Sequence, residues 1–243
     1  MSESAPVAYQ HVGVVIPAHN ELAALPSCLR AVLTAAAAAP APVDIVVVLD
    51  SCDDNSAGLA GRFGADVHFV TVDAENVGAA RAAGFTYLRS LSDTGMPTWY
   101  ATTDADTTVD PDWLIRQMKA DADMVLGVVR VADWRRMPAA AVRRYLQAYY
   151  ARTARGHDHV HGANMGFRAD PYWQLGGFRP LATGEDVQLV QRFEAAGYRV
   201  HRDAGLSVTT SARRTGRAPS GFAAHLRGLA EGNRPLRPLQ DLA

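Results

Sequence analysis

Two aspartates, separated by one residue, offer the most distinctive chemistry in the chain. Asp104 and Asp106 follow an apolar segment, Trp99–Thr103, and enclose only Ala105. Two carboxylates at this spacing on a turning backbone can approach one point, and hard cations such as Mg²⁺ and Mn²⁺ prefer such oxygen ligands. An Asx turn that ends a strand looks the same in a sequence. The pair therefore indicates either a divalent-cation site or a strand-ending turn.

Polar segments also follow two earlier apolar runs. The loop Pro17–Glu21 could hold a nucleobase or a ribose, although Asn20 could equally cap the helix that follows. Asp50 could accept a hydrogen bond from a base N–H, whereas the polar residues 53–55 are better placed to cap the next helix. We therefore expect a ligand role for Asp50 and a capping role for its polar neighbours.

Three further segments suit an anionic ligand or a proton transfer. Asn76–Arg81 opens a predicted helix whose N-terminus favours anions, although Arg81 could also be a surface residue. Glu185 and Asp186 begin another predicted helix, where an acidic residue either stabilises the helix dipole or serves as a general base. The small residues of Gly162–Arg168 suit the closely packed wall of a site.

Arginine and histidine clusters each leave two interpretations open. Arg213, Arg214 and Arg217 lie within five residues, and arginine forks bind phosphate, but a solvated basic loop is the alternative. The alternating histidines of His157–His161 suggest zinc, yet no fourth ligand at regular spacing and no cysteine supports it, so a polar loop is favoured.

Composition excludes several classes of protein. The chain has 243 residues, 48% hydrophobic and 20% charged, as expected for one globular domain. Its only lysine is Lys119, which excludes a P-loop and disfavours Schiff-base chemistry. A net charge of −1 disfavours a general nucleic-acid binder. Only two cysteines, no signal peptide and no long apolar stretch together predict a cytoplasmic protein without a membrane span.

The order of the predicted elements indicates the fold. Strands are expected at 12–16, 43–49, 67–72, 99–103 and 124–131, and another begins at 199–201. Helices are expected at 22–38, 57–63, 77–91, 138–155 and 184–196, with another starting at 110–112. Alternating strands and helices predict an α/β fold, with a mostly parallel central sheet and helices on both faces. Ligands of such sheets bind at the carboxyl ends of the strands, where Asp50 and Asp104 fall.

The motifs together resemble the GT-A glycosyltransferases of family 2. The resemblance runs over about residues 11–217 and rests on VVIPAHNE, VVVLDSCDDNS, NVGAARAAG, DADTTVDPDWL, GANMGFR and GEDVQLVQR. It implies a Rossmann-like GT-A domain over residues 1–217, with a nucleotide-binding half at about 11–106 and an acceptor half at about 107–217. Residues 218–243 would form a C-terminal helix and tail.

The resemblance also implies a reaction and roles for single residues. The reaction is transfer of a sugar, usually a hexose, from a nucleotide-diphosphate sugar to an acceptor hydroxyl, with Mn²⁺ or Mg²⁺ and with inversion; UDP is the first expectation and GDP the second. Asp186 would be the catalytic base, and Asp106 and Asp104 would hold the metal. The donor would contact Pro17, Ala18, Glu21, Asp50, Arg81, Asp104, Arg213, Arg214 and Arg217. The acceptor side would comprise Gly162, Asn164 and Glu185.

Some features depart from the family or stay open. Ala105 stands where the family often has a second acid, and nothing selects His201 or His225 as a further metal ligand. A retaining GT-A enzyme of the glucosyl-3-phosphoglycerate synthase type is the closest alternative. A non-catalytic nucleotide-sugar-binding protein is the alternative from another class. The resemblance also leaves a homodimer open.

Overall fold

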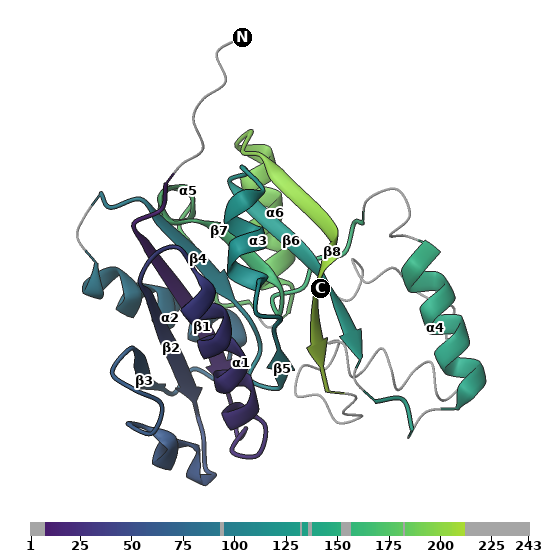
Figure 1. Cartoon of the computed structure of the whole chain (residues 1–243), viewed down its shortest axis with the longest axis horizontal. Coiled ribbons are helices and arrows are strands. Elements are labelled where there is room, and N and C mark those ends of the chain that lie inside the picture. Colours follow the sequence, from purple (N-terminus) through teal and green to yellow (C-terminus); the bar gives the residue numbers. More distant parts are fainter. Residues whose placement is uncertain are drawn as a thin grey trace.

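The structure is a computed structural model, and it describes residues 8–92, 95–131, 133–135, 138–151, 157–181 and 183–211. One sheet of eight strands runs through it, in the order β3-β2-β1-β4-β7-β6-β8-β5 (Figure 1). Arg213, Arg214, Arg217 and the segment 218–243, for which the sequence predicts a helix and tail, lie outside the described residues.

The first half of the sheet is parallel and matches the predicted order of elements. Its strands are runs of largely buried apolar, mostly β-branched residues, as expected for a covered parallel sheet. They are β1 (His11–Ala18), β2 (Val43–Asp50), β3 (Val67–Val72) and β4 (Thr98–Thr102). The helices between them are α1 (Leu25–Ala38) and α2 (Val77–Leu91). Between β2 and β3 the predicted helix is wrong, because only a 3-10 turn, η1 (Asn55–Leu59), forms before Gly61 and Gly64 take positive φ.

The second half of the sheet is mixed. Strand β7 runs antiparallel to both of its neighbours, β4 and β6, whereas β6 and β8 are parallel to each other. The strands are β5 (Thr107–Thr108), β6 (Met124–Val131), β7 (Met165–Arg168) and β8 (Val200–Thr210). The helices are α3 (Trp113–Lys119), α4 (Ala139–Ala151), α5 (Ala169–Gln174) and α6 (Glu185–Ala195). The sequence did not predict the short elements β5, β7 and α5.

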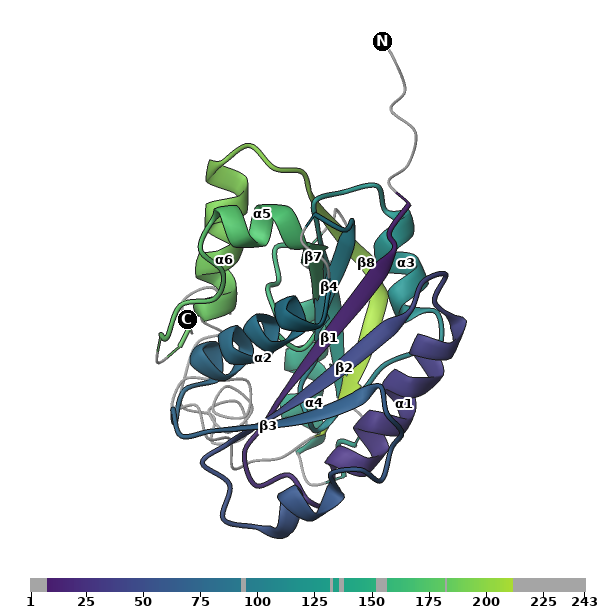
Figure 2. The same ribbon diagram turned by 90° about the vertical axis from the view of Figure 1, so that its left-hand side faces the viewer.

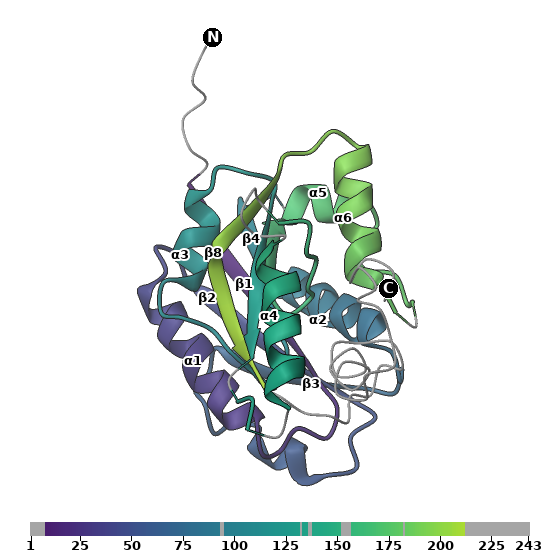
Figure 3. The ribbon, with the colours of Figure 1, turned by 90° about the vertical axis from the view of Figure 1, so that its right-hand side faces the viewer.

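Helices cover both faces of the sheet. Helices α1 and α3 pack one apolar cluster against it, and α2, α5 and α6 pack a second cluster against the other face (Figure 2). Helix α4 lies near the β6–β8 side of the sheet (Figure 3), where the Tyr149 hydroxyl accepts from the backbone N–H of Val129 at 2.9 Å. The predicted α/β architecture is confirmed, and it brings the carboxyl ends of β1, β2 and β4 to one edge.

Candidate active site

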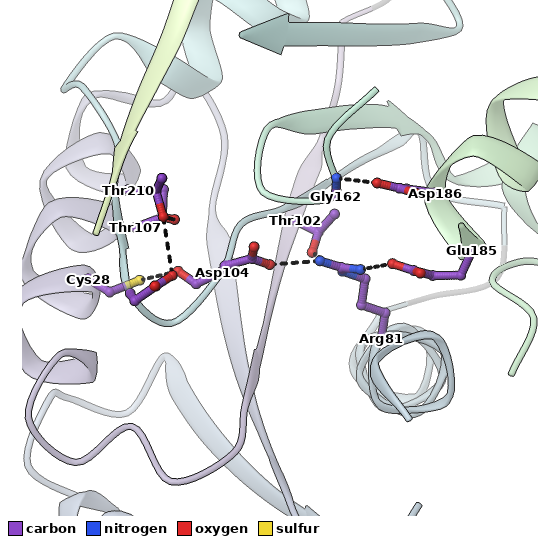
Figure 4. A network of polar contacts seen from close by, with 10 residues as sticks. Cys28, Arg81, Thr102, Asp104, Thr107, Gly162, Glu185, Asp186 and Thr210 are labelled. Carbon is purple, nitrogen blue, oxygen red and sulfur yellow. Dashed lines mark hydrogen bonds and ion pairs between the residues drawn. The ribbon is translucent and has the colours of Figure 1, made fainter. Parts of the chain in front are cut away.

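A buried arginine occupies the centre of this edge. Arg81 rises from α2 between Asp104 on one side and Glu185 on the other (Figure 4), and its side chain is 3% exposed. Its guanidinium donates to Asp104 Oδ1 at 2.7 Å, to Glu185 Oε1 and to Thr102 Oγ1 at 3.3 Å. Arg81 therefore ties the loop after β4 to the start of α6.

Close packing at the start of α2 brings these elements together. A Cβ added at Gly78 would lie 2.2 Å from the Arg179 carbonyl oxygen, so only glycine allows this approach. Asn76 caps α2 by accepting from the Ala79 N–H at 3.0 Å, and its amide donates to the Leu181 carbonyl at 2.9 Å. The α2 N-terminus is thus fixed against the segment that leads into α6.

The charges of this network depend on one another. Burial lowers the pKa of Arg81, but Glu185 and Asp104 outweigh it, so that the pKa of the guanidinium is raised. Burial raises the pKa of Glu185 and of Asp104, and Arg81 opposes both increases. The arginine stays charged, and it favours the ionised form of both carboxylates, which burial opposes.

The predicted base, Asp186, is oriented by two backbone groups. Its Oδ2 accepts from the Gly162 N–H at 2.8 Å (Figure 4). Its Oδ1 accepts from the Val187 N–H at 2.8 Å. The Gly162 contact joins α6 to the loop before β7, so residues from the two predicted acceptor-side segments do meet. A Cβ at Gly162 would lie 2.5 Å from the Arg81 guanidinium, which explains the glycine.

Asp106 faces the end of the last described strand. Its Oδ2 accepts from the Ser211 hydroxyl at 2.6 Å and its Oδ1 from the Thr210 hydroxyl at 3.4 Å. Asp104 and Asp106 are near enough that Asp106 helps to raise the pKa of Asp104. Within the described ranges, no group of three or more His, Cys, Asp or Glu side chains is arranged to hold a metal ion. The described part of the chain therefore offers two carboxylates here rather than a complete metal cage.

The predicted nucleoside side lies at the ends of β1 and β2. Pro17 and Ala18 pair with Val48 and Leu49 along the two strands, and Glu21, a residue that is 6% exposed, follows β1. Pro17, Ala18, Glu21 and Asp50 therefore share one edge of the sheet, as the sequence predicts.

Asp50 has a structural role at this edge of the sheet. Its carboxylate accepts from the backbone N–H groups of Ala74, Glu75 and Asn76 at 2.8–2.9 Å. Ser51 adds a hydroxyl contact at 3.1 Å. These bonds shape the loop after β3, so any contact between Asp50 and a nucleobase would be additional to this role.

Of the two helix caps considered from the sequence, at Asp54 and at Asn20, only the first forms. Asp54 caps η1 through the Ser56 N–H at 2.9 Å, as predicted. Asn20 does not cap α1, because its side-chain oxygen accepts from the N–H groups of Asp53 and Asp54 at 2.9 and 3.2 Å. The Asn20 side chain thus joins the loops after β1 and β2 at the predicted nucleoside edge.

Two expected acceptor-side residues are placed elsewhere. Asn164 is fully buried: its amide donates to the carbonyls of Val128 and Leu206 at 2.9 and 3.0 Å, and its oxygen accepts from Trp113 Nε1 at 2.9 Å. Glu185 points at Arg81, and its side chain is 7% exposed. Neither side chain lines an acceptor surface, because both are committed to partners inside the protein.

We expect Asn164→Ala to destabilise the protein without entering the chemistry. It leaves an indole N–H and two carbonyls unpaired in the interior, each worth about 1–3 kcal/mol, so the free energy of unfolding should fall by roughly 3 kcal/mol or more. Urea denaturation measures this loss. Gln147→Ala, at an exposed position on α4, is the control and should change stability by less than about 0.5 kcal/mol. An equal loss of stability in both variants would contradict the role of the buried Asn164 hydrogen bonds.

Among the described residues, the histidine cluster does not form a group that could hold a metal ion. His157 and His159 are 2% exposed, and their rings form a stacked series with His161. Burial lowers the pKa of His161 to about 3, so this ring is neutral. The expected polar loop is therefore a packed layer beside Tyr149 instead.

Sequence reasoning missed the hydroxyls that support the carboxylates. Thr102 bonds Arg81, and Thr210 and Ser211 bond Asp106, from positions that belong to no recognisable motif. The only available signal was the run of threonines and serine that ends β8, and its partner is more than a hundred positions away.

Comparisons with known proteins give one family match over most of the chain. The family model described as glycosyl transferase family 2 matches residues 13–176, about two thirds of the chain, including Asp50, Arg81, Asp104 and Asp106. None of the curated protein sequences compared with the chain matches it. No helix in the described ranges is both long and apolar enough to cross a bilayer.

Solved structures share the fold. Staphylococcus aureus TarS 1–349 in complex with UDP-GlcNAc has a TM-score of 0.62 at 12% identity, over 96% of this chain and 69% of that one. The mannosyltransferase PcManGT from Pyrobaculum calidifontis, in complex with GDP-Man and Mn²⁺, has a TM-score of 0.63 at 19% identity, over 98% and 70%. With the family model and the GT-A fold in agreement, the chain belongs to glycosyl transferase family 2 and is a glycosyltransferase.

Proposed function

We propose that the protein transfers a sugar from a nucleotide-diphosphate sugar to an acceptor hydroxyl with inversion, and that Asp186 is the general base. The observation that carries the proposal is the Arg81 bridge, because it joins the Asp104 loop to Glu185, the neighbour of Asp186. The bridge brings the expected diphosphate side and the expected base into one site.

The two-carboxylate loop fits a divalent cation. Asp104 and Asp106 supply oxygen ligands without a full protein cage, which suits Mg²⁺ or Mn²⁺, since these ions commonly keep waters and share phosphate oxygens. A bound cation would offset negative charge on the diphosphate. The relative PcManGT is described with GDP-Man and Mn²⁺, which supports the same ligand class here.

Different residues of the chain have different roles in the transfer. The acceptor oxygen forms a bond to the anomeric carbon while the bond from that carbon to the diphosphate breaks, and the hydroxyl proton passes to Asp186. Gly162 and Val187 hold the receiving carboxylate in place through their N–H groups. Arg81, which is buried and bonds Thr102, Asp104 and Glu185, positions the two carboxylates. The family resemblance implied a direct contact of Arg81 with the donor instead.

Donor recognition is assigned to the edge formed by β1 and β2. We place the nucleoside against Pro17, Ala18, Glu21 and the loop that Asp50 shapes. The arginines Arg213, Arg214 and Arg217 are proposed to contact the diphosphate. The two relatives are complexes with UDP-GlcNAc and with GDP-Man, so both bases need testing.

Thermal-shift titration tests the donor and the metal together. A ligand at a hundred times its dissociation constant stabilises by about 2.7 kcal/mol, which for a domain of this size raises the Tm by roughly 5–10 °C. We expect one of UDP and GDP to give this shift with Mn²⁺, and EDTA or Asp106→Asn to remove most of it. Full stabilisation and turnover in EDTA would contradict the metal assignment.

Product analysis separates the proposal from its alternatives. NMR of the anomeric proton should show a configuration opposite to that of the donor. A retained configuration would support the alternative of a retaining enzyme. Binding of the nucleotide without hydrolysis or transfer, over a broad panel of hydroxyl acceptors, would support a non-catalytic binding protein.

A further inference from the structure

The end of strand β8 contacts the proposed metal loop through side-chain hydroxyls. Ser211 donates to Asp106 Oδ2 at 2.6 Å, and Thr210 donates to Asp106 Oδ1 at 3.4 Å, so each carboxylate oxygen receives one hydroxyl. The shorter bond lies in the range of a charge-assisted O–H···O⁻ contact, whereas the longer one is weak.

A second hydroxyl fixes the direction of the Thr210 bond. Thr107 Oγ1 lies 3.2 Å from Thr210 Oγ1 and donates to it, and both threonines are buried. Because a hydroxyl has one proton and two lone pairs, Thr210 accepts from Thr107 and keeps its own proton for Asp106. The three groups form a directed chain that ends on the carboxylate.

The backbone holds this arrangement in register. Strand β5 pairs antiparallel with β8, with Thr107 opposite Thr210 and Thr108 opposite Thr209. The Thr107 N–H also donates to the Asp104 carbonyl at 3.0 Å, which closes a turn around Ala105. The loop with both carboxylates is therefore tied to β8 at its carboxyl end.

We propose that Ser211, assisted by Thr210, is a positioning residue for Asp106 and thereby sets the affinity of the site for its divalent cation. The inference rests on the proposed function, since it takes Asp106 as a metal ligand. A hydroxyl that bonds a ligating carboxylate fixes its orientation, and loss of such an outer partner typically weakens metal binding about 10–100-fold.

The test measures Mn²⁺ affinity in graded variants. The Tm is followed against Mn²⁺ concentration at saturating UDP or GDP, whichever stabilises the wild type. Ser211→Ala should raise the apparent Mn²⁺ dissociation constant about tenfold, and Thr210→Val should raise it less, because its bond is longer. Ser211→Thr keeps the hydroxyl and should restore most of the affinity.

A matched control lies on the same strand pair. Thr108 is exposed, and its hydroxyl bonds the Thr209 carbonyl at 3.3 Å rather than Asp106, so Thr108→Val should leave Mn²⁺ affinity unchanged. The Tm without metal or nucleotide should be similar in Ser211→Ala and the wild type, which separates positioning of the ligand from a general structural effect.

Each other result counts against the proposal. Unchanged or tighter Mn²⁺ binding in Ser211→Ala, with normal binding by the wild type, would overturn the Ser211 role alone. A loss in Ser211→Ala that Thr108→Val reproduces would assign the effect to strand pairing. Two results would overturn both this inference and the metal part of the proposed function. One is that Mn²⁺ does not raise the Tm of the wild type, and the other is that Asp106→Asn does not remove the rise.

Discussion

Replacement of Asp186 by asparagine should lower turnover by roughly 10³-fold while the donor still binds, because general-base catalysis typically contributes about 10²–10⁴-fold. The amide has nearly the shape of the carboxylate but cannot take the proton of the acceptor hydroxyl. The measurement is kcat with saturating donor and acceptor, together with the nucleotide-induced thermal shift.

The asparagine variant keeps only part of the local bonding. Asp186 accepts from the Gly162 and Val187 N–H groups, one at each oxygen, and an amide can accept at only one of them. A small loss of stability is therefore expected beside the large loss of turnover.

A charge-matched control isolates the chemistry at Asp186. Asp110 is exposed on the loop before α3, so Asp110→Asn makes the same change in charge without touching the site. It should keep full activity. Full turnover in Asp186→Asn with the donor still bound would show that another group takes the proton.

Replacement of Arg81 by methionine should produce a large loss of stability. Methionine keeps much of the volume, but it leaves the carboxylates of Glu185 and Asp104 without their cation. Breaking a buried ion pair from one side costs about 3–5 kcal/mol. We expect a decrease of that size in the free energy of unfolding, measured with urea at pH 8, and a loss of activity because both carboxylates lose their positioning partner.

The loss should depend on pH in a defined direction. Burial raises the pKa of Glu185 and of Asp104, and the charge of Arg81 opposes this rise. Removal of Arg81 should therefore raise both pKa values further. The native variant then binds more protons than its unfolded chain, and stability decreases as pH rises through the folded-state pKa. Arg81→Met should therefore be less destabilised at pH 5 than at pH 8.

Two further variants check the charge argument. Arg81→Met combined with Glu185→Gln removes one of the stranded charges and should recover part of the stability at pH 8. Arg89 lies on the exposed side of α2 over the Trp173 ring at 4.7 Å, so Arg89→Met should cost less than about 1 kcal/mol. An Arg81→Met variant as stable as Arg89→Met would contradict the buried bridge.

Local pattern was sufficient for most of the fold. The ranges of β3, α2 and β6 agree with the predicted ranges residue for residue, because β-branched runs and a capped apolar helix carry their own signals. The helix expected at 57–63 failed where positive-φ glycines interrupt it. Strand β5 has two residues and exists only through pairing with β8, so no local pattern could reveal it.

The sequence by itself determined the alternation of strands and helices, and therefore which polar residues lie at the carboxyl ends of β1, β2 and β4. It also determined the family, through the order of its motifs. Tertiary structure alone decided the partners: Arg81 meets Glu185 across 104 positions, and Asp106 meets Ser211 across 105. It likewise turned Asn164 inward. Such contacts depend on how distant strands and helices pack and on what they bury, and no local spacing encodes that.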